Sequence, residues 1–406
     1  MNITRVKGFA DILPGEVETW QFVEEKAREV FARYNFGEIR IPIMEKTELF
    51  SRSIGETTDI VEKEMYTFAD QDAKESLLTL RPEGTAGVVR AYVENELYKV
   101  EPVQKLFYLG PMFRREKPQK GRLRQFYQIG AELLGRSDPM ADAEILLLLS
   151  DFFSAVGLGG VTLELNSVGC GVCRPKYRDA LLAFLEDRKD KLCENCRRRM
   201  ERNPLRVLDC KEKSCLQITA QAPSILEFLC NECQAHLKEV KRLLEAARLD
   251  YKLNPRMVRG LDYYCRTAFE WTSTQLGAQN TVAAGGRYDG LVEQLGGPPI
   301  PGVGFALGME RLVYLLRTDE TDRLTDGDIG PIADVAVDGG QVLAACTNQY
   351  PSAHCLIDRV THVRRDVAGY PYLGAYINGD ATQVLSIQWG DALTGANLLI
   401  RPIPPG

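Results

Sequence analysis

The sequence predicts an α+β protein in which an antiparallel hairpin and amphipathic helices form one domain, interrupted by an inserted helical domain. Three observations support this fold class. Two neighbouring segments, 105–116 and 122–134, alternate apolar and polar residues as half-buried strands do. Apolar residues recur at spacings of three and four over 16–36, as in an amphipathic helix. From about 158 to 253 the alternating strands thin out, cysteines cluster and charged helical segments appear.

Composition narrows the class of protein. The 406 residues indicate two or three domains, and 45% hydrophobic with 26% charged residues is typical of a soluble globular enzyme. The net charge of −6 argues against nucleic-acid binding by gross charge, although a local basic patch is compatible with it. No apolar run resembles a signal peptide or reaches the roughly 18 residues of a membrane span. We therefore expect a cytoplasmic protein with no membrane partner.

Local signals define the first elements. A helix is expected over 16–36. Residues 38–44 alternate like a strand, but Pro42 cannot donate a hydrogen bond to a ladder, so this strand should lie at an edge or an interface. A second helix should follow Thr85 and run to about Leu97.

The predicted hairpin carries unusual side chains. Its two strands are joined by the polar segment 117–121, KPQKG, which predicts a long tip. Alternation places Arg114 and Glu116 on one face of the first strand. On the second strand, one face holds Arg122, Arg124, Phe126, Gln128 and Glu132. These residue types do not make a core face, and the alternative to a functional face is a solvated one, which antiparallel sheets often have.

Later segments predict that the sheet resumes after the inserted domain. Residues 137–156 should form a buried helix before the insertion. Strands resume at 261–271, and a glycine-rich stretch covers 284–290. Residues 302–316 are typical of a strand that turns into a helix, with Arg311 in the first turn of that helix.

The eleven cysteines indicate reduced thiols or metal ligands, because the count is odd and no export signal is seen. The pairs are Cys170/Cys173, Cys193/Cys196 and Cys230/Cys233, with Cys210/Cys215 spaced more widely. Two pairs can form a tetrahedral zinc knuckle, and the alternative is that the thiols are small core residues. Catalysis by a Cys–His or Ser–His pair is poorly supported, because the chain has only three histidines.

Several segments together resemble the histidyl-tRNA synthetases, a family of class II aminoacyl-tRNA synthetases. The three class II motifs are resembled by residues 36–50, 113–128 and 302–312. The amino-acid-binding loop is resembled by TLRPEGTA at 79–86, and a peptide of the histidine enzymes by RGLDYY at 259–264. The segment KGFADILP at 7–14 resembles the family's N-terminal segment. The resemblance reaches to about residue 320. It implies a class II synthetase-type antiparallel sheet flanked by helices, an inserted helical domain, a C-terminal α/β anticodon-binding domain and a homodimer formed through motif 1.

The same resemblance divides the chain into four parts. They are the first part of the catalytic core (1–157), the inserted domain (158–253), the second part of the core (254–322), and a linker with an anticodon-binding domain (323–406). From Ala333 onward the chain contains six Asp but no Glu, and four Arg but no Lys. Usage of charged residues does not ordinarily break in this way within one domain. We therefore expect an aberrant tail, for example after a reading-frame shift, or a highly divergent one.

The resemblance implies a ligase that activates histidine with ATP, releasing pyrophosphate, and then transfers histidine to the 3′ end of tRNA(His). ATP is the substrate, with Mg²⁺ bridging its phosphates. Guanidinium groups would stabilise the charge on the phosphate oxygens, and an aromatic ring with a guanidinium would enclose the adenine. The implied catalytic residues are Arg114, Arg259 and Arg311. The implied ATP-binding residues are Arg114, Glu116, Arg122, Phe126 and Arg311.

Histidine recognition and tRNA binding are assigned by the same resemblance. The implied histidine-binding residues are Glu83, Gly84, Thr85, Arg114, Gln128, Glu132, Arg259, Tyr263 and Tyr264. The implied tRNA-binding residues, at the hairpin tip, are Lys117, Lys120, Arg122 and Arg124. Each set has a structural alternative: pairing at a helix N-terminus for Glu83 and Thr85, strand packing with one ring on each side for the two tyrosines, surface ion pairs for the arginines and a solubilising turn for the tip. The family needs no zinc, so structural zinc is not favoured and no metal site is assigned.

Two other functions compete with this one. A non-catalytic, synthetase-like regulatory subunit of ATP phosphoribosyltransferase lacks an anticodon domain, which would suit the aberrant tail. Such a subunit has no reason to keep Arg114, Glu132, Arg259 and Arg311 together. A zinc-dependent nucleic-acid-binding protein would depend on the cysteine pairs and the basic loop alone.

Overall fold

The computed structural model describes residues 3–55, 58, 60–71, 76–117, 122–258, 263–277 and 280–325, and beyond these the strands between 332 and 402. The chain divides into two compact units, residues 1–316 and 317–406. No helix in the described part of the chain is long and apolar enough to cross a membrane.

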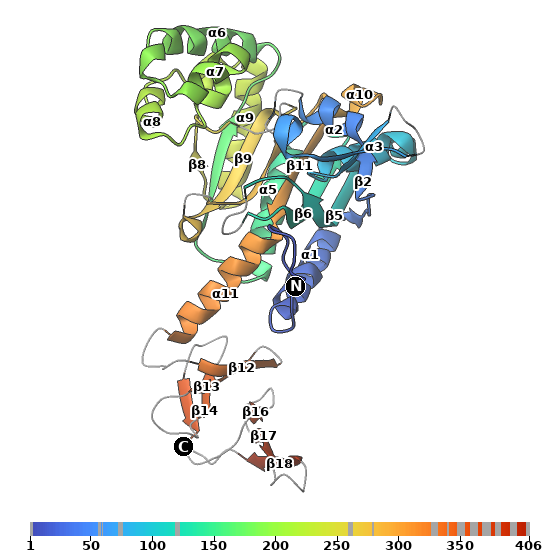
Figure 1. Ribbon diagram of the computed structural model, residues 1–406, viewed down its shortest axis with the longest axis vertical. Helices are drawn as coiled ribbons and strands as arrows, with labels where there is room; N and C mark the ends of the chain where they lie inside the picture. The colour runs from blue at the N-terminus through green and yellow to red at the C-terminus, as the bar shows by residue number, and fades with distance from the viewer. Residues whose placement is uncertain are drawn as a thin grey trace. The chain divides into compact units, whose positions relative to one another are not determined.

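An eight-stranded sheet forms the centre of the first unit (Figure 1). Its order is β1 (Gly37–Glu38), β5 (Gln104–Phe113), β6 (Gln125–Leu134), β11 (Gly302–Gly308), β10 (Thr281–Arg287), β9 (Cys265–Ser273), β7 (Val161–Ser167) and β8 (Lys252–Leu253). The inner neighbours pair antiparallel, whereas β1 and β8 pair parallel at the two edges. The predicted hairpin, β5 with β6, and the predicted α+β class are confirmed.

Helices cover both faces of this sheet. On one face, the main core packs β-strand residues such as Phe107 and Phe305 against α1 (Val17–Arg33), α5 (Pro139–Ala155), α9 (Asn231–Ala246) and α11 (Met309–Thr325). Tyr108 follows Phe107 and therefore faces the other way, where a separate cluster includes Val88 of α3 (Thr85–Glu94). The remaining helices here are α2 (Thr47–Ile54), α4 (Leu97–Val100) and α10 (Leu291–Gln294).

The strand expected over 38–44 is not continuous. Its first part is β1, which lies at the sheet edge as Pro42 predicted. The chain then leaves the sheet, and β2 (Met44–Lys46) joins a separate sheet with β4 (Leu77–Leu80) and β3 (Tyr66–Ala69). A proline between the two pieces lacks the N–H that a continuous ladder would need. The helix after Thr85 ends at Glu94 rather than near Leu97, where α4 begins.

The inserted segment begins later than predicted. β7 pairs with β9 and β8, so it belongs to the central sheet, and the chain leaves that sheet after Ser167 rather than at 158. The segment then forms α6 (Cys173–Glu186), α7 (Glu194–Arg202) and α8 (Lys213–Thr219), which Figure 1 shows grouped apart from the sheet. Short helical turns lie at Ile60–Glu64 in the core domain, at Lys189–Lys191, Pro204–Val207 and Ile225–Phe228 in the insertion, and at Thr274–Leu276 after β9.

The described elements of the second unit beyond residue 331 are all strands. One antiparallel sheet holds β12 (Ile332–Asp338), β13 (Gln341–Cys346), β14 (His354–Ile357) and β15 (Arg364–Val367). Another holds β16 (Ala375–Ile377), β17 (Gln383–Trp389) and β18 (Ala396–Pro402). The expected α/β pattern is therefore not seen in the described part of the tail, where the sequence has no amphipathic helical periodicity.

Candidate functional site

A pocket opens on the central sheet where β6, β10 and β11 lie side by side. The starts of α3 and α11 and the two tyrosines before β9 complete its wall. Ten of the predicted site residues line it: Glu83, Thr85, Arg114, Glu116, Arg122, Phe126, Gln128, Tyr263, Tyr264 and Arg311. Segments separated by more than two hundred residues in the chain thus form one site.

Glu132 lies just behind the pocket wall and is fully buried. The Thr85 hydroxyl donates to its Oε1 at 2.6 Å, and the Tyr288 hydroxyl donates to its Oε2 at 2.5 Å. Burial raises the pKa of Glu132 to about 8, although both hydroxyl groups oppose that shift. Gly304 on the neighbouring strand leaves room for this carboxyl, because a Cβ there would overlap Oε2.

Glu83 and Thr85 form the N-terminal end of α3. The Glu83 carboxylate accepts from the backbone N–H groups of Thr85 at 2.7 Å and Ala86 at 2.9 Å. The helix-terminal pairing is therefore present, yet both side chains also line the pocket, so the two roles are compatible. Burial raises the pKa of Glu83. Gly84 between them has no space for a side chain, because the Tyr108 ring lies against it.

Gln128 offers the pocket an acceptor that none of the described protein groups uses. Its Oε1 is buried and has no hydrogen-bond partner within the described residues. An unpaired buried oxygen is costly unless a ligand or a water molecule satisfies it. The residue lines the pocket on β6, between Phe126 and the buried Glu132.

Tyr263 and Tyr264 both line the pocket, so the expectation that one ring would face each way is wrong. Their ring centroids are 4.8 Å apart, because the chain turns here before β9 begins and does not yet alternate as a strand. Tyr263 also contacts Tyr288 edge to face, with centroids 5.7 Å apart. Burial raises the pKa of Tyr263 and of Tyr288 well above the ordinary value, so both hydroxyl groups stay protonated.

Three arginines, Arg114, Arg122 and Arg311, also line the pocket. Arg114 Nε donates to the Pro82 carbonyl at 2.8 Å, and its guanidinium lies 5.1 Å from the centre of the Phe126 ring. Arg311 Nη1 donates to the Thr281 carbonyl at 2.6 Å. Burial, Arg122 and Arg114 all lower the pKa of Arg311. Cations held close enough to repel one another make a site that favours an anion.

Glu116 partly offsets these cations. It is 7% exposed, pairs with Arg122, and has Oε1 3.8 Å from Arg114 Nη1. Arg114, Glu116 and Arg122 lie beyond the ends of β5 and β6 rather than on the strands as predicted. The chain departs from the ladder there, and the three side chains gather by pairing instead of by alternation.

The hairpin tip is only partly available for a partner. Lys117 is exposed, whereas Lys120 and Arg259 lie outside the described residues. Arg124 Nε donates to the Glu116 carbonyl at 3.1 Å, and its Nη1 donates to the Lys7 carbonyl at 3.4 Å. Arg124 therefore fastens the N-terminal segment to the hairpin, a task that its place in the sequence did not predict.

Tyr288 and Glu310 contribute to the site and were not predicted. Tyr288 lies within the glycine-rich stretch 284–290, and its hydrogen bond to Glu132 joins residues 156 positions apart. Glu310 precedes Arg311, lines the pocket and accepts from the Tyr127 N–H at 2.8 Å. Burial raises the pKa of Glu310 to about 7. For Glu310, its place beside Arg311 in the motif 3 segment was the available signal.

Comparisons with known proteins agree on one family. A family model described as Histidyl-tRNA synthetase matches residues 8–312. The histidine–tRNA ligase of Trichlorobacter lovleyi is 57% identical over 350 residues, which cover 86% of this chain and 83% of the relative. The histidine–tRNA ligase of Geobacter sulfurreducens is 60% identical over 314 residues, covering 77% of this chain and 76% of the relative.

Solved structures extend the comparison. The apo histidyl-tRNA synthetase of S. aureus is 31% identical, covers 90% of this chain and 97% of its own, and superposes with a TM-score of 0.63. An ATP phosphoribosyltransferase regulatory subunit/histidyl-tRNA synthetase from Bacillus halodurans is 20% identical, covers 78% of this chain and 84% of its own, and has a TM-score of 0.57. At that identity the second likeness shows the fold alone.

Proposed function

This chain belongs to the histidyl-tRNA synthetase family, and on that basis we propose how its pocket divides the work of a histidine–tRNA ligase. The enzyme joins histidine to tRNA at the expense of ATP. The observation that carries the division is that one pocket brings two chemically different sets of side chains together. One set is the three guanidinium groups of Arg114, Arg122 and Arg311, and the other is the carboxyl, hydroxyl and amide groups of Glu83, Thr85 and Gln128.

The arginines of the pocket would bind the ATP phosphates. Arg114 and Arg311 would hold oxygens of the α- and γ-phosphates, and both are already anchored by backbone carbonyl groups. Phe126, beside Arg114, offers a ring on which the adenine stacks, with Arg311 over its other face. Glu116, which pairs with Arg122, would accept from the adenine amino group.

The carboxyl, hydroxyl and amide groups of the pocket would bind histidine. Glu83 and the unpaired Gln128 oxygen suit the α-ammonium, together with Thr85. Gly84, at the start of α3, has no side chain, so the Tyr108 ring packs directly against the backbone there. Glu132 would share one proton with the imidazole of the bound histidine. The rings of Tyr263 and Tyr264 would lie beside that imidazole. A buried carboxyl with a strongly raised pKa is typical of a functional site.

The first step needs no general base, because the nucleophile is already a carboxylate. A histidine carboxylate oxygen forms a bond to the α-phosphorus, the bond to the bridging oxygen breaks, and pyrophosphate leaves with the electron pair. Charge that spreads over the phosphate oxygens meets Arg114 and Arg311, so positioning and fixed electrostatics supply the rate. By resemblance, Arg259 adds a third cation at the α-phosphate and the histidine carboxylate.

Mg²⁺ is expected with the ATP, and the residues present fit it. Glu310 lines the same pocket as the arginines, and a carboxylate oxygen is a ligand that Mg²⁺ prefers. When bound, the ion would neutralise charge on the phosphates. The arginines do the remaining work of orienting the triphosphate.

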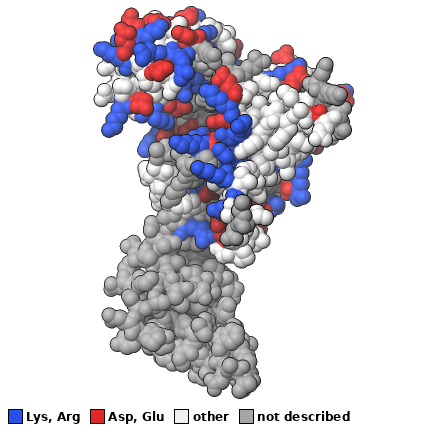
Figure 2. Space-filling view, in the orientation of Figure 1, with Lys and Arg blue, Asp and Glu red and all other residues white. Residues whose placement is uncertain are grey.

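The second step brings the 3′ end of tRNA to the same pocket, where a terminal ribose hydroxyl displaces AMP from the adenylate. Figure 2 shows Lys and Arg side chains gathered in the middle of one face, below the inserted domain, where they are suited to phosphates. Lys117, exposed at the base of the hairpin tip, and Lys120 belong to this proposed contact, whereas Arg122 and Arg124 serve the pocket and the N-terminal segment. We propose that the enzyme charges tRNA in the cytoplasm.

A homodimer is also proposed. The segment that resembles motif 1 leaves Ile43 and Met44 about half exposed, and the neighbouring strands expose Phe68 and Leu77 to a similar extent. Contiguous exposed apolar side chains are typical of an interaction surface. The small sheet β2–β4–β3 is therefore the surface through which two copies would pair.

Histidine-dependent exchange of pyrophosphate into ATP tests the proposal. Histidine should support exchange, whereas glutamine and phenylalanine should not. Arg114→Ala and Arg259→Ala should each lower the rate by about 10²–10³-fold, the usual effect of removing one preorganised group that stabilises charge. Arg242→Ala, in an exposed ion pair on α9, is the matched control and should exchange normally. Folded protein without any exchange would instead support the regulatory-subunit function, which the 57% identity to a ligase disfavours.

A further inference from the structure

Eight cysteines of the inserted segment meet in two groups of four. The first group contains Cys170, Cys173, Cys230 and Cys233, and the second contains Cys193, Cys196, Cys210 and Cys215. Within each group the sulfur atoms all lie within 4.8 Å of one another, and all eight are free thiols. Spacing alone did not reveal which pairs would come together.

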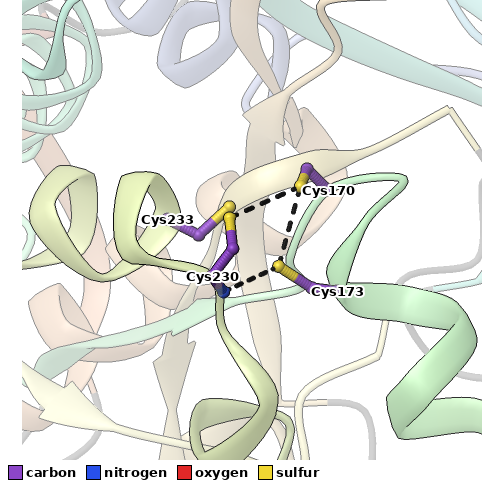
Figure 3. Close-up of side chains that lie close together, drawn as sticks. All are labelled: Cys170, Cys173, Cys230 and Cys233. Carbon is purple, nitrogen blue, oxygen red and sulfur yellow. Dashed lines mark hydrogen bonds between the residues drawn. The ribbon is translucent and has the colours of Figure 1, made fainter.

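The distances between the sulfur atoms are those of a metal tetrahedron. Cys170 Sγ lies 3.6 Å from Cys173 Sγ and 3.8 Å from Cys230 Sγ (Figure 3), and Cys193 Sγ lies 3.9 Å from Cys210 Sγ. A disulfide would require about 2.05 Å. Four sulfurs placed tetrahedrally at about 2.3 Å from zinc are about 3.8 Å apart. Both groups therefore have the dimensions of a four-thiolate site.

Backbone groups support negative charge on these sulfurs. The Cys230 N–H donates to Cys173 Sγ at 3.1 Å, and the Cys193 N–H donates to Cys215 Sγ at 3.3 Å. The Cys196 N–H donates to Cys193 Sγ at 3.4 Å. Hydrogen bonds of this kind orient metal ligands and favour the thiolate over the thiol.

The inserted segment has a small hydrophobic core of its own, and the cysteines are part of it. All eight cysteines belong to or pack against one small core that is separate from the core of the sheet. Its apolar members include Leu181, Leu185 and Val207, and short helical turns make up much of the chain around them. Small domains with limited cores are usually stabilised by disulfides or by a structural metal.

We propose that each group binds one Zn²⁺ as a structural tetrathiolate site. Binding converts four thiols to thiolates and releases their protons to solvent. Four protein ligands close the coordination sphere, so the sites are structural rather than catalytic. A sulfur tetrahedron also suits iron. Zinc is the ion proposed because it has no redox chemistry, and a site that only holds chain segments together needs none.

The two sites hold different parts of the chain. The first joins the segment after β7 to the start of α9, whose Val240 and Leu244 pack in the core of the central sheet. It therefore closes the base of the inserted domain. The second joins α7 to the segment around α8, wholly within the insertion.

Metal analysis of the full chain, purified with a reductant and without chelator, tests the proposal. The chain should carry about two zinc ions, one for each four-thiolate site. Cys170→Ser and Cys193→Ser should each lose one equivalent, and the double variant should lose both. Cys265→Ser is the matched control, because Cys265 lies in neither group, and it should keep both ions. Zinc lost only with Cys170→Ser would overturn the second site, and zinc lost only with Cys193→Ser would overturn the first.

A second measurement does not depend on how the variants fold. Organomercurial titration of the wild-type thiols should release both zinc ions, and exchange with Co²⁺ should give the charge-transfer and ligand-field bands of tetrahedral thiolate cobalt. Folded chain that contains iron, disulfides within the groups, or eight reactive thiols and no zinc would overturn the proposal.

Discussion

Glu132 shows how the fold sets the ionisation of a single residue. Its carboxyl is fully buried, and burial raises its pKa to about 8 while Thr85 and Tyr288 donate to its two oxygens. The imidazole of free histidine has a pKa of about 6.5. Between these two values Glu132 carries a proton and the imidazole does not, so the pair holds one proton to share.

We predict a bell-shaped pH profile of kcat/KM for histidine, with limbs near about 6.5 and about 8. Below the lower limb both groups are protonated, and one proton must leave when histidine binds. Above the upper limb neither group is protonated, and one proton must be taken up. Pyrophosphate exchange measured from pH 5.5 to 9 with Glu132→Gln should show the lower limb only. An upper limb that persists in Glu132→Gln would show that Glu132 only supports Thr85.

The same shift affects stability in a defined direction. The ordinary glutamate pKa of 4.5 is raised in the folded chain, so the unfolded state ionises first as the pH rises. Glu132 therefore contributes most at low pH, and its contribution is lost as the pH rises from about 4.5 to about 8.

We predict that Gly304→Ala impairs histidine activation because its methyl group would overlap the Glu132 carboxyl. Overpacking of this kind costs about 1–3 kcal/mol of unfolding free energy. Histidine kcat/KM should fall more than tenfold, or by more than about 1.4 kcal/mol. Gly290→Ala, where a Cβ meets open space, should change neither quantity appreciably. Urea unfolding and pyrophosphate exchange measure the two effects, and equal behaviour of the two variants would contradict the prediction.

Most of the pocket residues could be predicted from the sequence, because they lie in short motifs that resemble those of a known family. Glu83 with Thr85, and Phe126 with Gln128, are examples in which neighbours along the chain share the site. The sequence alone did not predict Tyr288, whose role depends on the pairing of β10 and β11 beside β6. Strand alternation also failed to predict the positions of Arg114 and Arg122. Arg114 comes after the end of β5 and Arg122 comes before the start of β6, so neither belongs to a strand.

Among the elements, three are joined by one buried ionic network. Arg287 on β10 donates from Nε to Asp142 of α5 at 3.1 Å and from Nη1 to Asp289 at 3.0 Å. His236 of α9 lies 3.2 Å from the same Asp142 carboxylate. Burial acts to raise the pKa of Asp142, but His236 and Arg287 hold it below the ordinary value. The network links the base of the inserted domain to the central sheet.

We predict that Arg287→Met destabilises the chain by about 3–5 kcal/mol, because it leaves the Asp142 charge buried without its main partner. Arg242→Met breaks an exposed ion pair and should have little effect. Chemical denaturation of the two variants gives the comparison. Similar midpoints for Arg287→Met and the wild type would show that His236 alone is a sufficient partner for Asp142.

The periodicity of apolar residues predicted the long helices and strands. It failed where pairing with a distant strand determines whether a segment belongs to the sheet. The helix over 16–36 and the hairpin emerge as α1, β5 and β6, because their apolar faces fill the core. The boundary at 158 was misplaced because β7, before the cysteine-rich segment, was not recognised as a strand of the sheet. Membership of a sheet depends on the partner strand, which here comes a hundred residues later.

For the whole molecule, the exposed apolar strands predict self-association. Light scattering should give twice the mass of one chain. Met44→Lys combined with Phe68→Asp should give a monomer, because charges would be buried in the interface without partners. Leu253→Lys, on β8 at the other edge of the central sheet, is a matched exposed position and should remain dimeric. A dimer that survives the double substitution would place the interface elsewhere.

The tail predicts a separation between the two steps of the reaction. The chain from Ala333 lacks Glu and Lys, which suits an altered reading frame. Pyrophosphate exchange should therefore be normal, whereas charging of tRNA(His) should be weak. Translation of the encoding DNA in its other frames should restore a tail rich in Lys and Glu with helical periodicity. If no frame does so, the divergence is genuine, and efficient charging would show that the tail works as it stands.

The meeting of Cys170 with Cys230 has a topological consequence. Because these sulfurs are 3.8 Å apart, Cys170 and Cys230, which lie sixty positions apart in the chain, close the segment between them into a ring. The entropy of such a ring changes slowly with its length, and little of that change reaches the chain outside. The part of the segment between Cys173 and Cys230 can therefore be lengthened, shortened or exchanged for another sequence while β7 and β9 keep their register.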